Sequence, residues 1–314
     1  MLEGKDDCSI FGNHINSSIF GHMTALTYLD LSSNQLNGIP PISFRNLSNL
    51  KVLDISANNF TGNLEDLLLG PFSLLHELLI SENQLSGSLP DITLLSSLKK
   101  LRVSSNQLNG CLPTVFKHHS ALEILDLSNN HLRGTISEAH LSNLSSLMYM
   151  CTSSNPLTFD FSSNWIPPFQ LRLLSLASCK LGPKFPNWIR NQEYINHLDI
   201  SNTQISDTLP IWFWNLSSGI GLLNLSSNDI RGKLFWKSVN IQEIDLNSNN
   251  FDGPLPKLSA GCLKINLSQN KFSRTLISLS IVEDLSLRFL DISHNHLFGA
   301  LPDNLDAFSR PGVS

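Results

Sequence analysis

Residues 26–38 read Leu26-Thr27-Tyr28-Leu29-Asp30-Leu31-Ser32-Ser33-Asn34-Gln35-Leu36-Asn37-Gly38, which fits the pattern LxxLxLxxNxLxG. The pattern recurs at intervals of 21 to 25 residues, and its Asn position falls at Asn58, Asn83, Asn106, Asn130, Asn155, Cys179, Thr203, Asn228, Asn249, Asn270 and Asn295, with a weaker copy at Asn13. Such a period is typical of a solenoid, in which each unit packs against its neighbours. We therefore predict a single domain over residues 1–314, built from about thirteen repeats with a partial first repeat at 1–20.

The pattern predicts one short strand in each repeat. In the LxL segment, the alternation of side chains places both Leu residues inside and the residue between them outside. Every repeat returns the chain to the same edge, so neighbouring strands should be parallel. The Asn amide that follows can bond to backbone groups left open by the turn, which predicts a ladder of Asn side chains. Cys179 and Thr203 replace Asn in this ladder and should form two weaker rungs.

Many repeats continue as LxGxLP, as in Leu85 to Pro90, Leu108 to Pro113, Phe251 to Pro256 and Leu297 to Pro302. Gly permits a turn that a side chain would block, and Pro ends strand pairing. The whole pattern predicts an α/β repeat solenoid, a right-handed horseshoe or superhelix whose concave face is a parallel sheet.

The composition excludes several classes of protein. Hydrophobic residues make up 41% of the chain and charged residues 15%, which suits a packed core and argues against a disordered tail. The formal net charge of −5 gives no reason to expect nucleic acid or an anionic membrane as a partner. The five cysteines, at positions 8, 111, 151, 179 and 262, include no CxxC pair. We therefore predict neither a zinc site nor a disulfide framework, and no cofactor.

The sequence carries no motif of catalysis. It contains no GxSxG turn, phosphate loop, HExxH or dinucleotide fingerprint, so we expect no enzyme. The close histidine pairs, His118 with His119 and His294 with His296, are not interpreted as metal ligands. Core packing is the expected role of the tryptophans Trp165, Trp188, Trp212, Trp214 and Trp236.

The run from Trp165 to Ser217 is more specific than the repeat itself. It contains Trp165-Ile166-Pro167-Pro168-Phe169, then Cys179-Lys180-Leu181-Gly182-Pro183, and it closes with Trp212-Phe213-Trp214-Asn215-Leu216-Ser217. Together with the GxLP ending, this run resembles plant leucine-rich-repeat receptor-like proteins, most of all the ethylene-inducing xylanase receptor type. The resemblance implies a plasma-membrane glycoprotein of innate immunity that senses microbial proteins or peptides outside the cell. It also implies signalling through a receptor-kinase adaptor and a co-receptor.

The chain departs from those receptors in several respects. It shows no signal peptide, paired-cysteine caps, non-repeat island or apolar run of the roughly 20 residues that a membrane helix needs. We expect it to correspond to an interior part of such an ectodomain, on the extracellular side of the plasma membrane. Three other interpretations stay open: a secreted inhibitor of cell-wall-degrading enzymes, a developmental peptide receptor, and a truncated gene product with little function of its own.

Seven N-x-Ser/Thr sequons predict glycosylation, at Asn16, Asn46, Asn59, Asn143, Asn215, Asn224 and Asn266. Three of them, Asn46, Asn143 and Asn215, share one position shortly before a repeat begins, which should lie on the convex side. Asn224 and Asn266 instead fall between the two inward residues of LxL and should point out of the concave face.

The outward strand positions form the predicted binding surface, because their side chains are not needed in the core. Most of them are Asp or Ser, so clusters of other charged residues stand out. Repeats three and four carry His76, Glu77, Lys99, Lys100 and Arg102, and repeats seven and eight carry Arg172, His197 and Asp199. We predict that these residues contact an extracellular protein or peptide ligand; an ordinary solvated charged face is the competing interpretation.

Overall fold

The computed structural model describes residues 19–90, 92–113, 116, 119–216, 219–235, 241–256, 261–275 and 287–299. The predicted partial first repeat lies almost entirely outside these residues, as do His118 and Trp236. The chain forms two compact units, Met1–Leu147 and Met148–Ser314, and each is described by itself. A single domain over residues 1–314 remains a prediction.

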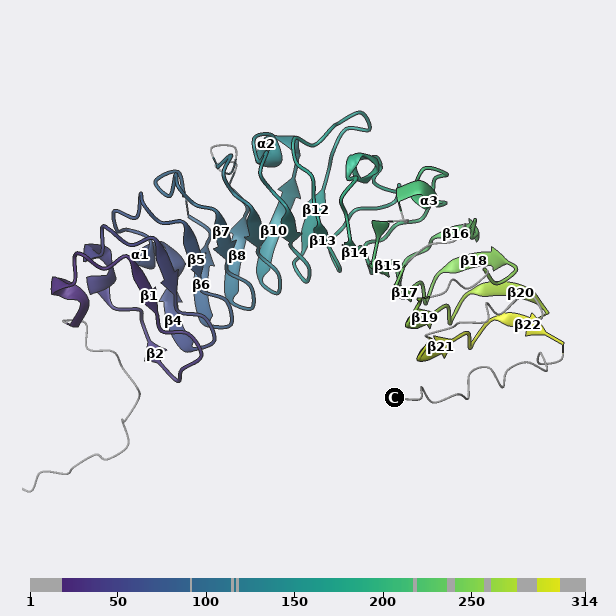
Figure 1. Cartoon of the computed structure of the whole chain (residues 1–314), viewed down its shortest axis with the longest axis horizontal. Coiled ribbons are helices and arrows are strands. Elements are labelled where there is room, and N and C mark those ends of the chain that lie inside the picture. Colours follow the sequence, from purple (N-terminus) through teal and green to yellow (C-terminus); the bar gives the residue numbers. More distant parts are fainter. Residues whose placement is uncertain are drawn as a thin grey trace, which may run out of the picture. The chain divides into compact units, whose positions relative to one another are not determined.

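Unit 1 contains two parallel sheets (Figure 1). Its main sheet is built from the LxL strands β1 (Tyr28–Asp30), β3 (Val52–Asp54), β5 (Glu77–Leu79), β7 (Lys100–Arg102) and β9 (Ile124–Asp126), paired in that order. The second sheet comes from the segments after each ladder Asn, namely β2 (Asn37–Gly38), β4 (Asn59–Asn63), β6 (Gln84–Ser88), β8 (Gln107–Cys111) and β10 (His131–Ile136). Short helices η1 (Ile19–His22), η2 (Ile42–Asn46), α1 (Leu64–Leu67) and α2 (Glu138–Leu141) lie between the strands.

Unit 2 repeats this arrangement. Its main sheet contains β11 (Tyr149–Cys151), β13 (Leu173–Ser175), β14 (His197–Asp199), β15 (Leu222–Asn224), β17 (Glu243–Asp245), β19 (Lys264–Asn266) and β21 (Phe289–Asp291). Its second-sheet strands are β12 (Leu157–Phe159), then β16 (Arg231–Lys233), β18 (Asn250–Gly253), β20 (Lys271–Thr275) and β22 (His296–Phe298). The helices are η4 (Asn187–Asn191) and α3 (Phe213–Leu216). The predicted solenoid of parallel strands, one for each repeat, is thus confirmed.

The inward residues of LxL form the core. Leu53 in β3 and Ile55 directly after it, for example, are fully buried, whereas Asp54 between them is partly exposed. Removing a Leu or Ile side chain from water stabilises a fold by about 1.5–3 kcal/mol. Because each repeat contributes such a pair, the energy of the fold comes from stacking neighbours and not from any one repeat.

The ladder of Asn side chains is also confirmed. The Asn106 amide donates to the carbonyl oxygens of Val103 (3.3 Å) and Ser104 (3.2 Å) in its own repeat, and to that of Ile80 (2.9 Å) in the preceding one. Its oxygen accepts the N–H of Leu85 at 2.9 Å. Asn58, Asn83, Asn130, Asn249, Asn270 and Asn295 bond in the same way. Each rung therefore satisfies buried backbone groups of two repeats at once.

The two rungs without Asn are built differently. The Cys179 thiol donates to the Thr152 carbonyl at 3.3 Å, as an Asn amide would. It offers no amide oxygen to the N–H of Leu157, which instead bonds to the Asn155 carbonyl of its own repeat at 2.8 Å. At the next rung, the N–H groups of Leu181 and Gly182 bond to the main-chain carbonyl of Thr203, at 3.1 and 3.0 Å. Backbone carbonyls thus take over the accepting role of the missing amide oxygens.

This change interrupts the second sheet. Between β12 and β16, the described residues of the second sheet form isolated bridges, Thr158 with Lys180 and Thr208 with Arg231, in place of strands. The two repeats concerned are those whose ladder residues are Cys179 and Thr203. A backbone carbonyl reaches less far than an Asn side chain. Residues 181–182 therefore lie closer to residues 203–205 than a regular second-sheet strand would allow.

The buried and exposed cysteines should differ in reactivity. Burial raises the pKa of Cys262 to about 11, whereas Cys111 is exposed on β8. Because the thiolate is the reactive form, we expect iodoacetamide at pH 8 to modify Cys111 at least about tenfold faster than Cys262. Peptide mass spectrometry after timed alkylation measures both rates, and equal rates would contradict the placement of Cys262 in the core.

Candidate functional site

The structure brings together the predicted cluster of unit 1. The register of β5 and β7 places Glu77 beside Lys100 and Leu79 beside Arg102. The Lys100 ammonium lies 2.8 Å from the Glu77 carboxylate, and both side chains are partly exposed. Lys99 and Arg102 are exposed, and His76 is half-buried. These residues form one mixed-charge area on the outward face of the main sheet, with cations in excess.

The three predicted residues of unit 2 also lie close together. Arg172 is exposed directly before β13, and its carbonyl accepts the N–H of His197 at 3.1 Å. His197 and Asp199 lie on β14 and line a shallow cavity of about 250 Å³ on the outward face, together with Asn224 and Lys264.

The outward Asp residues have a local structural role that the sequence analysis did not foresee. The Asp199 carboxylate accepts the N–H of Ser201 at 3.0 Å and its hydroxyl at 2.7 Å. Asp54, Asp126, Asn224 and Asn266 hold the Ser two residues later in the same way. These bonds end the strand, so they account for the recurrence of Asp and Ser without a ligand. Ligand contact by Asp199 remains a prediction.

The sequons occupy two kinds of position. Asn46, Asn59, Asn143 and Asn215 are exposed, while Asn224 and Asn266 are partly exposed at the outward positions of β15 and β19. Asn16 lies outside the described residues. A glycan on Asn224 would lie over the shallow cavity beside His197 and Asp199.

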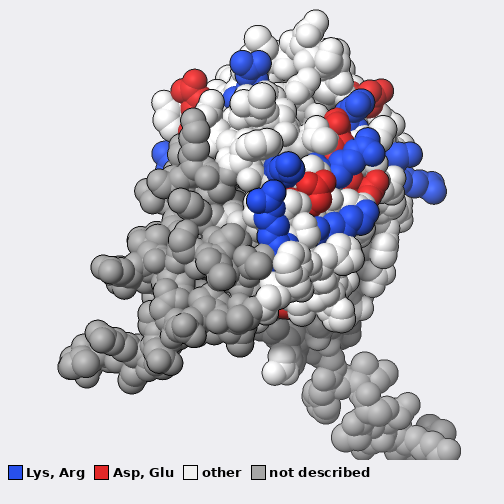
Figure 2. Space-filling view, turned by 90° about the vertical axis from the view of Figure 1, so that its right-hand side faces the viewer, with Lys and Arg blue, Asp and Glu red and all other residues white. Residues whose placement is uncertain are grey.

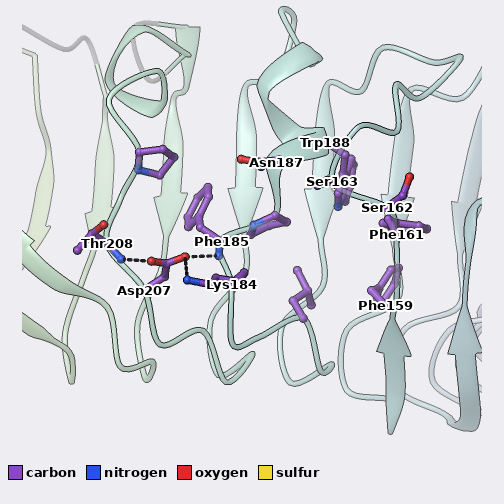
Figure 3. Close-up of a pocket in the computed structure, with 13 residues that line it drawn as sticks. Phe159, Phe161, Ser162, Ser163, Lys184, Phe185, Asn187, Trp188, Asp207 and Thr208 are labelled. Carbon is purple, nitrogen blue, oxygen red and sulfur yellow. Dashed lines mark hydrogen bonds and ion pairs between the residues drawn. The ribbon is translucent and has the colours of Figure 1, made fainter.

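A larger cavity, of about 460 Å³, lies in unit 2 where the second sheet is interrupted (Figure 3). We call it the aromatic pocket. Its aromatic lining residues are Phe159, Phe161, Phe185 and Trp188, and its polar ones include Ser162, Ser163, Asn187 and Thr208. The rings of the lining support one another, since Phe161 meets Trp188 edge to face at 5.5 Å, and Phe185 packs on the buried Phe213 at 5.3 Å.

Lys184 and Asp207 face each other at one wall of the aromatic pocket (Figure 3). The Asp207 carboxylate accepts the N–H groups of Phe185 at 3.2 Å and Thr208 at 2.9 Å, and it lies 3.8 Å from the Lys184 ammonium. Burial raises the pKa of Asp207, but these hydrogen bonds and the charges of Lys184 and Arg231 outweigh that effect, so its pKa lies below the ordinary value. The Lys184 side chain, in contrast, is 83% exposed.

The repeat pattern in the sequence does not predict this pocket. Trp188 is buried, in line with the core role expected for the tryptophans, yet it also lines the cavity. The signal present in the sequence was the coincidence of two ladder substitutions, Cys179 and Thr203, with the aromatic run from 165 to 217. Among the described residues, no group of three His, Cys, Asp or Glu side chains could hold a metal ion.

Comparisons with known proteins agree with the fold. Two family profiles described as leucine rich repeat match the chain, one at residues 13–60 and 96–157 and the other at 194–216 and 286–308. The structure of PEPR1-AtPEP1 is 26% identical with a TM-score of 0.71, and the match covers 90% of this chain and 44% of that one. The plant peptide hormone receptor RGFR1, solved in complex with RGF2, gives 22% identity and a TM-score of 0.69 over 91% of this chain and 54% of that one. The chain is a leucine-rich-repeat protein.

Its curated relatives are plant receptor-like proteins. Receptor-like protein EIX1 of Solanum lycopersicum is 53% identical over 103 residues, which are 33% of this chain and 10% of that protein. Receptor-like protein 1 of Arabidopsis thaliana is 30% identical over 286 residues, 89% of this chain and 20% of that protein. The predicted resemblance is thus confirmed, and its likeness to EIX1 covers one third of the chain. The chain spans 10% to 20% of the length of these relatives.

In the part of the chain that the structure describes, the helices are four or five residues long, and none is long and apolar enough to cross a membrane.

Proposed function

We propose that this chain is a ligand-binding part of a plant cell-surface receptor-like protein that senses a microbial protein or peptide in innate immunity. The observation that carries the proposal is the cationic cluster of β5 and β7, whose side chains are available on the outward face. Lys99 and Arg102 are exposed, and the Lys100 ammonium pairs with the Glu77 carboxylate at 2.8 Å. The relatives support the class of function, because they are receptors by name.

The sequons support the same surface. Glycans at Asn224 and Asn266 would occupy the outward face of β15 and β19, and a bulky hydrated chain there would exclude a protein partner. The outward face of β5 and β7 carries no sequon. We therefore assign the first contact with an acidic ligand surface to Lys99, Lys100 and Arg102, with His76 at its rim. Arg172 and His197 would contribute in unit 2.

We expect charge reversal at Lys100 and Arg102 to slow ligand association about tenfold at low salt and much less at high salt. Exposed interface charges act mainly on encounter, through long-range attraction that salt screens. The measurement is surface plasmon resonance of an ethylene-inducing fungal xylanase and a panel of other secreted microbial proteins over the immobilised chain. The variant should keep its melting temperature, because an exposed ion pair such as Lys100–Glu77 contributes no more than about 1 kcal/mol.

The control is a variant that makes the same change in net charge at residues outside the proposed binding surface. Arg133→Glu with Arg190→Glu alters two exposed residues that lie outside the outward strand positions. It should bind like the unmodified chain. Equal slowing by both variants would show a general effect of net charge and would contradict the assigned surface. Inhibition of a polygalacturonase by the chain would favour the secreted inhibitor instead.

A further inference from the structure

The aromatic pocket adjoins a basic area that the proposed function does not use. The Thr208 bridge to Arg231 places the wall of the pocket next to β16, and the N–H of Arg231 donates to the Asp207 carbonyl at 3.0 Å. From there, β16, β18 and β20 follow one another in register. The pocket and these three strands therefore form one continuous surface within unit 2.

Cations outnumber acids among the exposed residues of these strands. Arg231 and Lys233 on β16 and Lys271 and Arg274 on β20 are exposed, and we call these four residues the basic row. Asp252 on β18 lies in register between Lys233 and Lys271. Figure 2, which looks onto the side where these strands lie in Figure 1, shows Lys and Arg side chains gathered around fewer acidic ones.

The excess of positive charge is local. The whole chain has a formal net charge of −5, so the basic row is positive although the chain as a whole is negative. A neighbouring carboxylate, that of Asp229, already accepts the hydroxyl of Ser206 at 2.7 Å and the amide of Asn250, which leaves it less able to pair with the row. The stem of Lys233 lies against Gly253 of the next strand, since a side chain at Gly253 would meet its Cγ at 3.0 Å.

We propose that the aromatic pocket and the basic row together bind an extended acidic segment of a partner protein, which inserts one aromatic side chain into the pocket. The lining supplies ring surface for the anchor, with Phe161 half-buried, while Ser163 and Asn187 provide polar contacts to its backbone. Lys184, exposed at the wall, and then the basic row pair with carboxylates that follow the anchor.

The dimensions fit such a segment. Neighbouring strands lie about 4.8 Å apart, so β20 lies roughly 14 Å from the chain at Thr208, a span of four or five extended residues. Large aromatic anchors in desolvated pockets carry much of the energy of protein interfaces, and complementary charges steer their approach. The cations of the basic row match the carboxylates of an acidic peptide, whereas a neutral glycan offers them no negative charge. The observations thus favour a peptide over a glycan.

The test uses the whole chain and fluorescein-labelled peptides, acetyl-Trp-Asp-Glu-Asp-Glu and its reverse sequence, followed by fluorescence anisotropy at about 50 mM salt. We expect saturable binding of at least one direction. Replacement of Trp by Ala, or of the four acids by Asn and Gln, should each weaken it at least tenfold.

Variants of the chain locate the site. Ser163→Trp, which fills the pocket from an exposed position, and Lys233→Glu with Lys271→Glu should each weaken binding at least tenfold. The control pair, Lys51→Glu with Arg133→Glu, makes the same change in charge on exposed residues of unit 1 and should bind normally. Circular dichroism melting identifies any variant that fails to fold, and Lys184→Gln then serves as a milder change at the pocket wall.

Three results would overturn the proposal. The first is equal affinity for the Trp and Ala peptides, which would exclude the pocket. The second is equal affinity for the acidic and neutral peptides, which would exclude the basic row. The third is that neither peptide binds, while cellohexaose binds saturably and Ser163→Trp abolishes that binding. This result would assign the pocket to a glycan. None of these outcomes depends on the outward face of unit 1, so they are distinguishable from failure of the proposed function.

Discussion

Replacing Gly182 with alanine should lower the free energy of unfolding of unit 2 by about 3 kcal/mol. An added Cβ would overlap the carbonyl group of Gln204 and lie 2.8 Å from the backbone nitrogen of Ile205. These are main-chain atoms, so they cannot rotate aside as a flexible side chain could. Separating the two segments would lengthen the hydrogen bonds from Leu181 and Gly182 to the Thr203 carbonyl, now 3.1 and 3.0 Å.

Gly219→Ala is the matched control, because the nearest atom to its added Cβ is the Ile195 carbonyl oxygen at 3.8 Å. We expect this variant to change stability by no more than about 0.5 kcal/mol. Denaturant midpoints compare the two variants, and hydrogen exchange should show the loss of protection in Gly182→Ala concentrated around residues 181–208. Equal midpoints for the two variants would mean that the close approach at Gly182 is not required.

The regular features of the fold were predictable because each depends on one repeat and its neighbour. The LxL alternation fixed the strands, and the Asn position fixed the ladder, as the bonds of Asn106 to Ile80 and Leu85 show. One regular feature was missed. The residue before each ladder position, such as Ala57 or Glu82, has a left-handed φ of 51° to 63°, which no single residue type signals.

The aromatic pocket could not be predicted, because it depends on how two irregular repeats lie against each other. The sequence shows that Cys179 and Thr203 are short, and weaker rungs follow from that. It does not show that the Thr203 carbonyl would replace a side-chain acceptor, or that the second sheet would stop there. The Lys184–Asp207 pair joins residues 23 positions apart in sequence, across that irregular step. The charged cluster on β5 and β7 could be predicted, because the repeat register alone places Glu77 beside Lys100.

Replacing Asn130 with alanine should cost on the order of 1–3 kcal/mol, and replacing Thr203 with alanine should cost less. The Asn130 oxygen is the acceptor for the Leu108 N–H at 3.0 Å, and Ala would leave that buried donor without it. The Thr203 hydroxyl donates to the Ile200 carbonyl at 2.8 Å, but Asn228 also donates to that carbonyl at 2.9 Å.

The order of the two losses tests how the ladder works. Both positions are buried, so solvent exposure does not separate them. After Thr203→Ala, the Thr203 N–H still has its acceptor in Asn228 at 3.0 Å, and Leu181 and Gly182 still bond to the main-chain carbonyl at position 203. The difference in cost therefore reports the loss of the whole Asn130 amide: the Leu108 N–H loses its acceptor, and the carbonyls of Val103, Leu127 and Ser128 lose a donor. Urea midpoints of both variants, analysed with a common slope, give the comparison. Equal losses would show that filling the space at position 203, and not its hydrogen bonds, determines the stability of that rung.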